Sequence, residues 1–488
     1  MRLTTPDARG SGQPRIVVAG GGISGLAAAY RLTTRLPQAE VVVLEQADRL
    51  GGKIITEQRD GFVIEGGPEA LLTAKPVAAA LCAELGLVPD LHAPRPEARR
   101  SYILRDGQLR PLPDGLGNLL PTRLWPLATT PLISPLGKLR MGLDLVLPRR
   151  DDADADDESL GHFIERRLGR EAYTWLVSPL VGGIYAADGY RLSLAATFPH
   201  LRKLEQEHGG MIRATLAARR QAPPTTSARP APMQAPQHGL TQVVDALAAR
   251  LQAAGARIAT GSAVRAVHRQ GQGYALTLAT GETMWADAVI CAAPAPAAAT
   301  VLDPLDTRLA ELLRGIPHAS VATLALAYSR QVLPSTLMGS GYLTPRTERR
   351  PVKACTWVSA KWAGRAPVDA SLIRVSFGGA GMDKITELSD DDLLRLAQEE
   401  LRAVLGITAQ PCFTRLFRWP QAMPQYEPGH LERLAGIDAR LEGYPNLALA
   451  GNAYRGVGLA DCVQSGEQAA DRLMTYFATH GGAARHSA

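Results

Sequence analysis

Residues 15–32, RIVVAGGGISGLAAAYRL, decide the fold of this chain. A short apolar run leads into glycines and then into an alanine-rich helical pattern, which is the order of a strand, a tight turn and a helix. The turn fits G-x-G-x-x-G: Gly20 permits the turn, Gly22 lets the backbone approach a pyrophosphate, and Gly25 lets the helix pack close to the strand. The helix N-terminus adds free N–H groups and the positive end of a dipole. The stretch therefore predicts a dinucleotide phosphate site formed by Gly20, Gly21, Gly22, Ile23, Ser24 and Gly25.

A second strand with an acidic end follows this helix. Residues Glu40–Leu44, EVVVL, form another apolar run, and Glu45 comes directly after it. This carboxylate lies about 20 residues past the last glycine, where it can bind both ribose hydroxyls and would repel a 2′-phosphate. Strand, helix and strand make a βαβ unit, which implies a parallel sheet.

The composition limits the class of protein. The chain has 488 residues, 46% of them hydrophobic and 20% charged, so we expect two or more interleaved domains with a large core. A formal net charge of +6 is too dilute to indicate a nucleic-acid partner. The five cysteines occur singly, so the sequence predicts neither a disulfide framework nor a metal site and favours the reducing cytoplasm. No apolar run approaches the ~18 residues of a spanning helix, and residues 1–14 are expected to form a disordered tail.

Two further glycine motifs indicate which dinucleotide binds. Residues Arg49–Thr56, RLGGKIIT, resemble the R-x-G-G-R-x-x-[ST] motif of the FAD-binding amine-oxidase superfamily, with Lys53 where arginine is usual. Lysine keeps the charge but loses the guanidinium fork. Residues Gly451–Val463, GNAYRGVGLADCV, resemble the closing motif of the same superfamily, in which a glycine turn and a helix N-terminus meet the flavin. The resemblance implies that the cofactor is FAD, bound without a covalent link.

Beyond these motifs, the chain from residue 15 to residue 473 resembles the oxygen-dependent porphyrinogen oxidases of haem synthesis. Four patches carry the resemblance: EGGPEA at 65–70, PLVGGIY at 179–185, CTW at 355–357 and WPQAMPQY at 419–426. Ordinary core packing is the alternative reading of Trp419. The resemblance implies that FAD is lined by Glu45, Gln46, Arg49, Gly52, Lys53, Gly67, Pro68, Glu69, Ala70, Val264, Trp419, Val457, Gly458 and Leu459.

The family's reaction implies what the site has to do. A porphyrinogen loses six electrons and six protons to become an aromatic porphyrin, and a flavin supplies the hydride acceptor. The cation left on the substrate is delocalised over pyrrole nitrogens, so we expect no catalytic triad and a protein that mainly positions its reactants. Three rounds, each ended by dioxygen, would release three hydrogen peroxide molecules. The resemblance points to the backbone of Gly183 as the group that meets the reacting edge.

A flat tetrapyrrole needs an apolar slot with cations at its rim for the propionates. Leu343 and Phe377 lie in predicted strands that would form the slot, and Lys75 and Arg100 match positions where branches of the family place a propionate cation. An exposed cation is more often a solvated surface charge. Coproporphyrinogen III carries four propionates and protoporphyrinogen IX carries two, so two rim cations favour the former and leave the latter open.

The expected fold class is α/β with α+β character: a Rossmann-like FAD-binding domain interleaved with an antiparallel-sheet substrate domain and a helical lid. The proline-rich residues 221–237 indicate a linker. The predicted organisation is a tail at 1–14, FAD-binding parts at 15–90, 221–300 and 431–476, a substrate and helical region at 91–220, a sheet-containing substrate domain at 301–430, and a tail at 477–488.

Several alternatives stay open at this point. A flavin amine oxidase shares both glycine motifs, and some of these enzymes attach FAD to a cysteine, for which Cys412 is the candidate here. A non-enzymatic carrier of the same fold is the rival of another class, and the intact closing motif argues against it. The Leu- and Pro-rich residues 111–148 form either a lid or a surface that touches a membrane peripherally, on the inner face of the cell membrane. The partners implied by the family are a porphyrinogen, dioxygen and a chelatase that receives the product.

Overall fold

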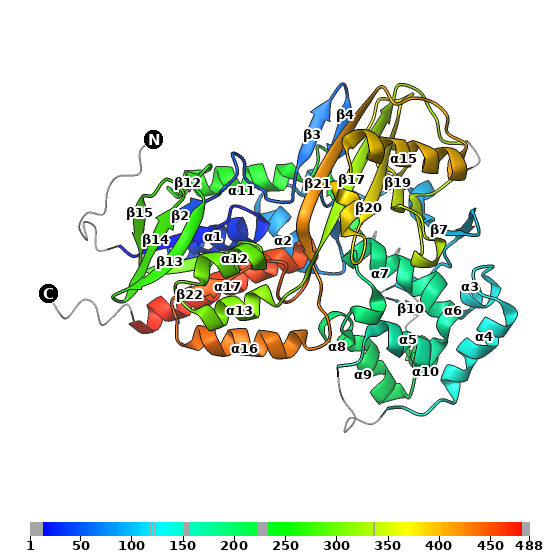
Figure 1. Ribbon diagram of the computed structural model, residues 1–488, viewed down its shortest axis with the longest axis horizontal. Coiled ribbons are helices and arrows are strands. Elements are labelled where there is room, and N and C mark those ends of the chain that lie inside the picture. Colours follow the sequence, from blue (N-terminus) through cyan, green and yellow to red (C-terminus); the bar gives the residue numbers. More distant parts are fainter. Residues whose placement is uncertain are drawn as a thin grey trace.

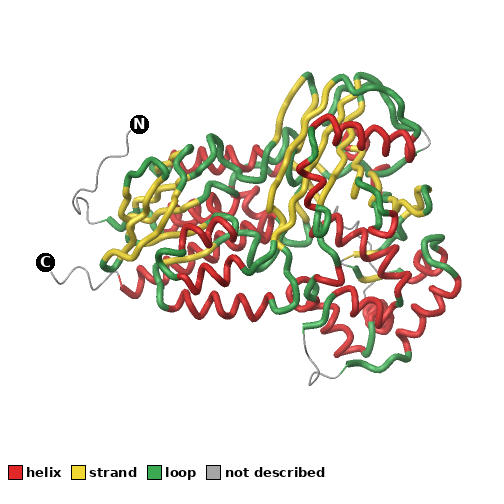
Figure 2. Tube along the Cα trace, viewed as in Figure 1, coloured by secondary structure: helices red, strands yellow, loops and turns green. Residues whose placement is uncertain are grey.

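The computed structural model describes residues 13–117, 119–121, 123–150, 157–221, 233–334 and 337–480, and they form three lobes (Figure 1). A layered α/β lobe contains both ends of the described chain. A lobe built on a large twisted sheet stands beside it, and an almost entirely helical lobe lies below that sheet (Figure 2). The predicted tail at 1–14 falls almost wholly outside the described residues.

The α/β lobe is centred on a five-stranded sheet in which every pair of neighbours is parallel. Its strands are nearly continuous apolar runs because helices cover both faces, as is usual for parallel sheets. The strand order is β12 (Arg257–Ala259), β2 (Glu40–Leu44), β1 (Arg15–Ala19), β16 (Ala288–Cys291) and β22 (Leu447–Leu449). This confirms the predicted βαβ opening and the Rossmann-like fold class.

Side chains from alternate positions of β1 feed the two cores on either side of this sheet. One face is covered by α1 (Ile23–Arg35), α2 (Pro76–Glu84), α11 (Thr241–Ala253) and α17 (Leu459–His480). The other is covered by α12 (Ala295–Leu302), α13 (Thr307–Arg314) and α16 (His430–Glu442), with the antiparallel strands β13 (Val264–Gln270), β14 (Gly273–Leu278) and β15 (Thr283–Ala286). Glycines at the helix crossings allow close packing, and a Cβ atom on Gly466 of α17 would lie 2.1 Å from the carbonyl oxygen of Ser24.

The second lobe is built on a seven-stranded sheet whose neighbours are antiparallel except for one parallel pair, β18 with β7. The order is β21 (Phe413–Pro424), β17 (His318–Tyr328), β20 (Ser371–Gly378), β19 (Val352–Trp357), β18 (Gly341–Leu343), β7 (Tyr102–Arg105) and β8 (Gln108–Pro111). Helix α15 (Asp390–Leu405) packs on one face. The other face carries α14 (Val358–Lys361) and the hairpin of β3 (Thr56–Arg59) and β4 (Phe62–Glu65).

The helical lobe encloses a core of its own. Its helices are α3 (Leu124–Thr129), α4 (Pro135–Gly142), α5 (Leu160–Leu168), α6 (Arg170–Ala172), α7 (Ser178–Tyr185), α8 (Leu194–Thr197), α9 (Pro199–His208) and α10 (Met211–Gln221). A π-helical turn at Tyr173–Val177 leads directly into α7. No helix among the described residues is long and apolar enough to cross a membrane.

The observed packing corrects three predicted boundaries. Residues 233–236 are not linker, because they form strand β11 (Met233–Pro236) between β5 (Leu71–Leu72) and β6 (Leu91–His92), while residues 222–232 lie outside the described residues. Helices α12 and α13 pack on the parallel sheet, so the boundary falls near His318 and not at 300. Helix α17 continues to His480, and Phe477 packs against the core, so residues 477–480 are not tail.

Candidate functional site

The glycine turn after β1 leaves no room for side chains at Gly20 and Gly25. Gly20 has φ +119°, and a Cβ atom there would lie 2.9 Å from the carbonyl of Ala292. A Cβ atom on Gly25 would lie 1.9 Å from the carbonyl oxygen of Gly20, so α1 packs directly against the turn. Gly22 caps α1 without a side-chain hydrogen bond, which leaves the N–H groups of the first turn available to a phosphate. The geometry fits the pyrophosphate site that the sequence predicts.

Glu45 lies at the end of β2 beside this turn. Its Oε2 accepts a hydrogen bond from the N–H of Gly21 at 2.7 Å, and its Oε1 accepts one from Ala47 at 2.8 Å. An ionised carboxylate has about four acceptor positions, so two remain for ribose hydroxyls. The side chain of Gln46 is exposed next to it.

The second glycine motif packs on the first. A Cβ atom on Gly52 would lie 3.2 Å from the Cα atom of Gly22, and Gly51 donates to the carbonyl of Gly21. Arg49 donates to the carbonyl oxygens of Leu50, Gly52 and Ile54, so its guanidinium shapes this turn. Three of its five N–H donors are used in this way, so two remain for an anion.

The side chain of Lys53 contacts strand β21, a contact that the sequence did not predict. Its Nζ donates to the carbonyl of Ala422 at 2.7 Å, and burial lowers the pKa of its ammonium group. The carbonyl is exposed to Lys53 by a bulge where β17 pairs with β21, at which Gln421 takes φ +45°. A bulge depends on the register of two distant strands, so no local signal marked Ala422.

The loop after β4 lies between the second glycine motif and the seven-stranded sheet. Trp419 donates its indole N–H to the carbonyl of Gly66 at 2.8 Å, and the Cζ2 atom of the same ring lies 3.8 Å from a Cβ position on Gly67. The carboxylate of Glu69 turns toward the sheet, where it accepts a hydrogen bond from Trp362. The backbone from Gly67 through Pro68 to Ala70, and not the Glu69 carboxylate, therefore remains available on the cofactor side.

The closing motif is held by a tyrosine and an aspartate. The Tyr426 hydroxyl donates to the carbonyl of Asn452 at 2.6 Å and accepts from the N–H of Gly456 at 2.8 Å. Asp461, in the first turn of α17, accepts from Gly458 at 3.1 Å. Sequence reasoning did not assign either side chain, although an acidic residue in a first helical turn is a recognisable signal. Val264, predicted to line FAD, begins β13 and packs on the core next to the parallel sheet.

Helix α7 brings Gly183, the residue expected to meet the reacting edge of the substrate, to Leu343, a residue of the predicted slot. A Cβ atom on Gly183 would lie 3.1 Å from Cδ2 of Leu343 on β18. Leu343, Tyr185 and Val457 of the closing motif all pack against the core of the helical lobe. Segments far apart in the sequence therefore border one core, and α7 lies against the sheet at β18 and β19 (Figure 1).

The prediction that Phe377 lines the same slot is wrong. Leu343 pairs with Ala354 and Ala354 pairs with Ser376, so these three side chains share one face of the sheet. Phe377 follows Ser376 and points to the other face, where it is 1% exposed beneath α15. The period of two in a strand puts neighbouring residues on opposite faces, and sequence alone did not show how separate strands align.

The two predicted propionate cations have different surroundings. Lys75 is the N-cap residue of α2, and its side chain forms an ion pair with Asp461. This ion pair ties α2 to the closing motif. Arg100 is exposed, and no described carboxylate forms an ion pair with its guanidinium; its backbone carbonyl accepts from Ser340 at 2.8 Å. Arg100 is therefore free to bind an anion, whereas Lys75 would share its charge with Asp461.

Comparison with known proteins agrees with this geometry. Residues 23–474 match the family described as flavin containing amine oxidoreductase. The chain is 36% identical to coproporphyrinogen III oxidase of Propionibacterium freudenreichii over 97% of this chain and 95% of that protein. It is 30% identical to chloroplastic protoporphyrinogen oxidase of rice, Oryza sativa, over 94% of this chain and 88% of that protein. A crystal structure from Exiguobacterium superposes with a TM-score of 0.83 at 29% identity, over 95% of this chain and 99% of that one.

The family match covers all three lobes, and the glycine turns fit the cofactor that the family description implies. The chain therefore belongs to the flavin-containing amine oxidoreductases, as an FAD-dependent oxidoreductase.

Proposed function

We propose that this protein oxidises a porphyrinogen to a porphyrin in haem synthesis, with FAD as cofactor and dioxygen as the final oxidant. The observation that carries the proposal is the contact of Gly183 on α7 with Leu343 on β18, beside a helical-lobe core that Val457 of the closing motif also borders. The relatives' names support a porphyrinogen as the substrate. The porphyrin product would then pass to a chelatase, since a free porphyrin is a poorly soluble apolar disc.

The reaction balances over three rounds. Bound FAD supplies the hydride acceptor. In each round the substrate loses one hydride from a bridging carbon and one proton, and one dioxygen becomes hydrogen peroxide. Over the three rounds the protons come from the fourth bridging carbon and from two pyrrole nitrogens. One porphyrinogen and three dioxygen molecules thus give one porphyrin and three hydrogen peroxide molecules.

The chain's own residues bind and orient the reactants. We assign the phosphates of FAD to the turn from Gly20 to Gly25 and its ribose to Glu45. The flavin is assigned to Lys53, the 67–70 backbone, Trp419 and Val457–Leu459. Gly183 has no side chain, so a flat substrate can approach its backbone closely, and Leu343 forms an apolar wall beside it. None of these steps requires an acid or base from the protein.

We infer that FAD is held without a covalent bond. Cys412, the candidate for a covalent link, donates its thiol to the carbonyl of Ala327 at 3.2 Å, just before β21 begins. Trp419 lies seven positions further along the chain, which is roughly 23 Å along a strand. FAD would then leave the protein on acid denaturation and appear in the supernatant.

Coproporphyrinogen III is the preferred substrate in this proposal. Two rim cations support this preference: Arg100, which has no carboxylate partner among the described residues, and Lys75, which lies beside the closing motif. Propionate binding acts equally on ground state and transition state, so Arg100→Gln should raise KM about tenfold with little change in kcat. An unchanged KM would remove Arg100 from the site.

The test is to purify the protein, record its visible spectrum, and mix it aerobically with coproporphyrinogen III and protoporphyrinogen IX separately while following porphyrin fluorescence and peroxide. A flavin spectrum, three peroxides per porphyrin and faster oxidation of coproporphyrinogen III are expected. Faster oxidation of protoporphyrinogen IX would keep the reaction and change the substrate. A flavin spectrum without oxidation of either would favour an amine substrate.

We also propose that the helical lobe touches a membrane surface peripherally. An apolar patch, formed by Trp125, Leu136, Leu139, Leu143 and Val146, has exposed fractions from 43% to 78%. It occupies α3, α4 and the residues after α4, at the outer edge of the lobe (Figure 1). Arg123, Lys138 and Arg149 lie in the same segment, and its single acidic residue, Asp144, is buried against Arg167.

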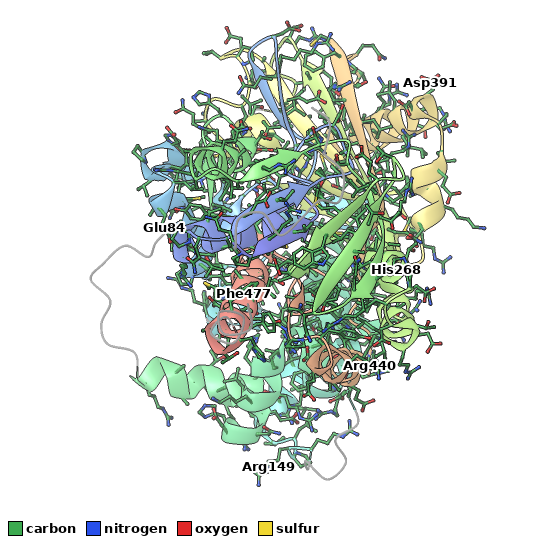
Figure 3. All side chains as sticks on the ribbon, turned by 90° about the vertical axis from the view of Figure 1, so that its left-hand side faces the viewer. Glu84, Arg149, His268, Asp391, Arg440 and Phe477 are labelled. Atoms are coloured by element: carbon green, nitrogen blue, oxygen red, sulfur yellow. The ribbon has the colours of Figure 1, made fainter. Side chains whose placement is uncertain are left out.

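Arg149, which follows the patch in sequence, lies at one end of the molecule in Figure 3, and Asp391 of α15 lies toward the other end. Exposed apolar side chains with basic neighbours fit an anionic lipid surface. The protein should therefore sediment with vesicles that contain phosphatidylglycerol, less with neutral vesicles, and less again as the double variant Trp125→Ser/Leu136→Ser. Equal sedimentation of wild type and variant would exclude the patch as the contact.

A further inference from the structure

The loop after β4 is held by donors from three adjacent strands of the seven-stranded sheet. The carbonyl of Gly66 accepts from Oγ1 of Thr323 on β17 at 2.7 Å and from Trp419 on β21 at 2.8 Å. The carbonyl of Gly67 accepts from Nη1 of Arg374 on β20 at 3.0 Å. The sheet thus fixes two consecutive peptide groups from side chains that lie up to 353 residues away in sequence.

The loop has no space in which to shift. A Cβ atom on Gly66 would lie 2.5 Å from Cδ1 of Phe417, and one on Gly67 would lie 1.9 Å from the carbonyl oxygen of Lys53. The loop is therefore enclosed between the sheet on one side and the second glycine motif on the other. If the contacts of the loop with the sheet shift, the loop must also shift against the second glycine motif.

Arg374 is the charged member of these contacts. Its side chain is 15% exposed, and it reaches Oε2 of Glu69 at 3.5 Å, while Lys361 reaches Oε1 of the same carboxylate at 3.3 Å. Burial alone would raise the pKa of Glu69, but Lys361, Arg374 and Trp362 hold that pKa at about 2. Glu69 is therefore ionised at neutral pH, and Arg374 is anchored to both ends of the loop from Gly67 to Glu69.

Fixing the carbonyls leaves the N–H groups of the loop for the cofactor. The N–H groups of Gly67 and Glu69 have no acceptor within the described chain, whereas the N–H of Gly66 donates to the carbonyl of Ile55. Gly67 and Glu69 are only partly buried, so these unpaired donors face space that a ligand or water can occupy. FAD is the partner that the adjacent glycine motifs supply.

We propose that Arg374 is a positioning residue for FAD: it holds the 66–70 loop in the conformation that presents its N–H groups to the cofactor, and its charge stabilises the reduced flavin. The proposal rests on the assignment of FAD to this loop and not on the identity of the substrate. Arg374 acts through the loop, because its guanidinium is already engaged by Gly67 and Glu69. The sequence analysis did not single out Arg374, although it is the one charged residue in the strand SLIRVSFG.

The experiment compares wild type with Arg374→Gln, Arg374→Lys and the control Arg395→Gln. Arg395 lies on α15 in the same lobe, with a 57% exposed side chain paired to Asp392 and Glu399. Each protein is stripped of FAD, retitrated with FAD by flavin fluorescence, and poised against reference dyes to measure the two-electron potential of the bound flavin. Thermal midpoints are recorded for all four proteins.

Arg374→Gln should bind oxidised FAD at least tenfold more weakly, because the loop loses a contact that holds it. The variant should bind reduced FAD weaker by a further tenfold, because the substitution removes a positive charge and leaves the negative charge of Glu69 with one cation fewer beside it. That further tenfold equals a fall of about 30 mV in the two-electron potential. Arg374→Lys keeps the charge but not the fork, so its potential should stay near that of wild type while FAD affinity still falls. Arg395→Gln should change neither.

A purely structural arginine gives a different pattern. If Arg374→Gln lowers the thermal midpoint but binds FAD with wild-type affinity and potential, the proposal is overturned. Should Arg374→Gln fail to fold, Thr323→Val decides whether the sheet contacts hold this loop for FAD, because it removes one donor to Gly66, leaves the charges in place and changes no residue assigned to FAD. A visible flavin spectrum and FAD affinity unchanged in that variant would also overturn the proposal. None of these readouts uses a porphyrinogen, so they hold even if the proposed substrate is wrong.

Discussion

The parallel-sheet lobe and the helical lobe bury similar cores by different means. In the first, Gly466 of α17 lies directly against α1 and the cores on the two faces of the sheet are apolar, while Arg31 of α1 forms partly exposed ion pairs with Glu84 and Glu467. In the second, the guanidinium of Arg167 is 0% exposed and bonds to Asp144 at 2.6 Å, with Glu205 at 3.4 Å. Close apolar packing tolerates no added atom, whereas a buried ionic cluster tolerates no lost partner. The parallel-sheet lobe should therefore be destabilised most by added side-chain atoms, and the helical lobe by loss of a charged partner.

The largest effect is expected from Arg167→Met in the helical lobe. It leaves the carboxylate of Asp144 buried without its cation and breaks the hydrogen bonds from Arg167 to the carbonyls of Pro148 and Gly209. The free energy of unfolding should fall by about 3–5 kcal/mol, measured by urea denaturation. The exposed Arg308→Met serves as the control. A loss below about 1 kcal/mol would mean that the cluster is not what holds the lobe together.

A smaller loss is expected from an added methyl group in the parallel-sheet lobe. Gly466→Ala places a Cβ atom 2.1 Å from the carbonyl oxygen of Ser24, so α17 must move away from α1. Overpacking of this kind should cost about 1–3 kcal/mol and weaken FAD binding, because α1 carries the phosphate site. Gly142→Ala is the matched control, since nothing lies within 4 Å of its Cβ position. Equal stability of the two variants would contradict the packing argument.

The third prediction separates the lobes by pH. Burial would raise the pKa of Glu205, but hydrogen bonds and charge from Arg166 and charge from Arg167 hold it below the usual 4.5. A lowered folded-state pKa gives stability that is present above pH 4.5 and is lost as the pH falls through the folded value. Hydrogen exchange should therefore show α5 and α9 losing protection at acid pH before the apolar central strands β1 and β16. Glu205→Gln should reduce that difference, and simultaneous loss in both lobes would count against the prediction.

The smallest effect on stability is expected at the surface of the helical lobe. Trp125 is 77% exposed, so Trp125→Ser removes little buried area and should change the free energy of unfolding by less than about 0.5 kcal/mol. Thermal and urea denaturation check this value. A larger loss would show that Trp125 packs inside the lobe, and the decrease in vesicle binding could then not be assigned to the patch.

Sequence patterns predicted local elements better than their assembly. The opening βαβ unit, the FAD cofactor and the family were correct, because each depends on short patterns whose physical requirement is local. The linker at 221–237 was partly wrong because residues 233–236 complete a small sheet with strands more than 140 residues earlier. Phe377 and Leu343 were placed in one slot, although pairing through β19 turns them to opposite faces.

The sequence by itself determined where side chains are forbidden. Gly20 is required because the turn takes φ +119° there, and Gly25 because a Cβ atom would strike the carbonyl oxygen of Gly20 within the same βαβ unit. Only the tertiary structure decided which carbonyls, cations and faces meet at the site: Ala422 reaches Lys53 through a bulge, and Arg374 reaches Gly67 from across the sheet. The reason is physical, since strand register and bulges are set by contacts between segments hundreds of residues apart, and a period of two then assigns every side chain to a face.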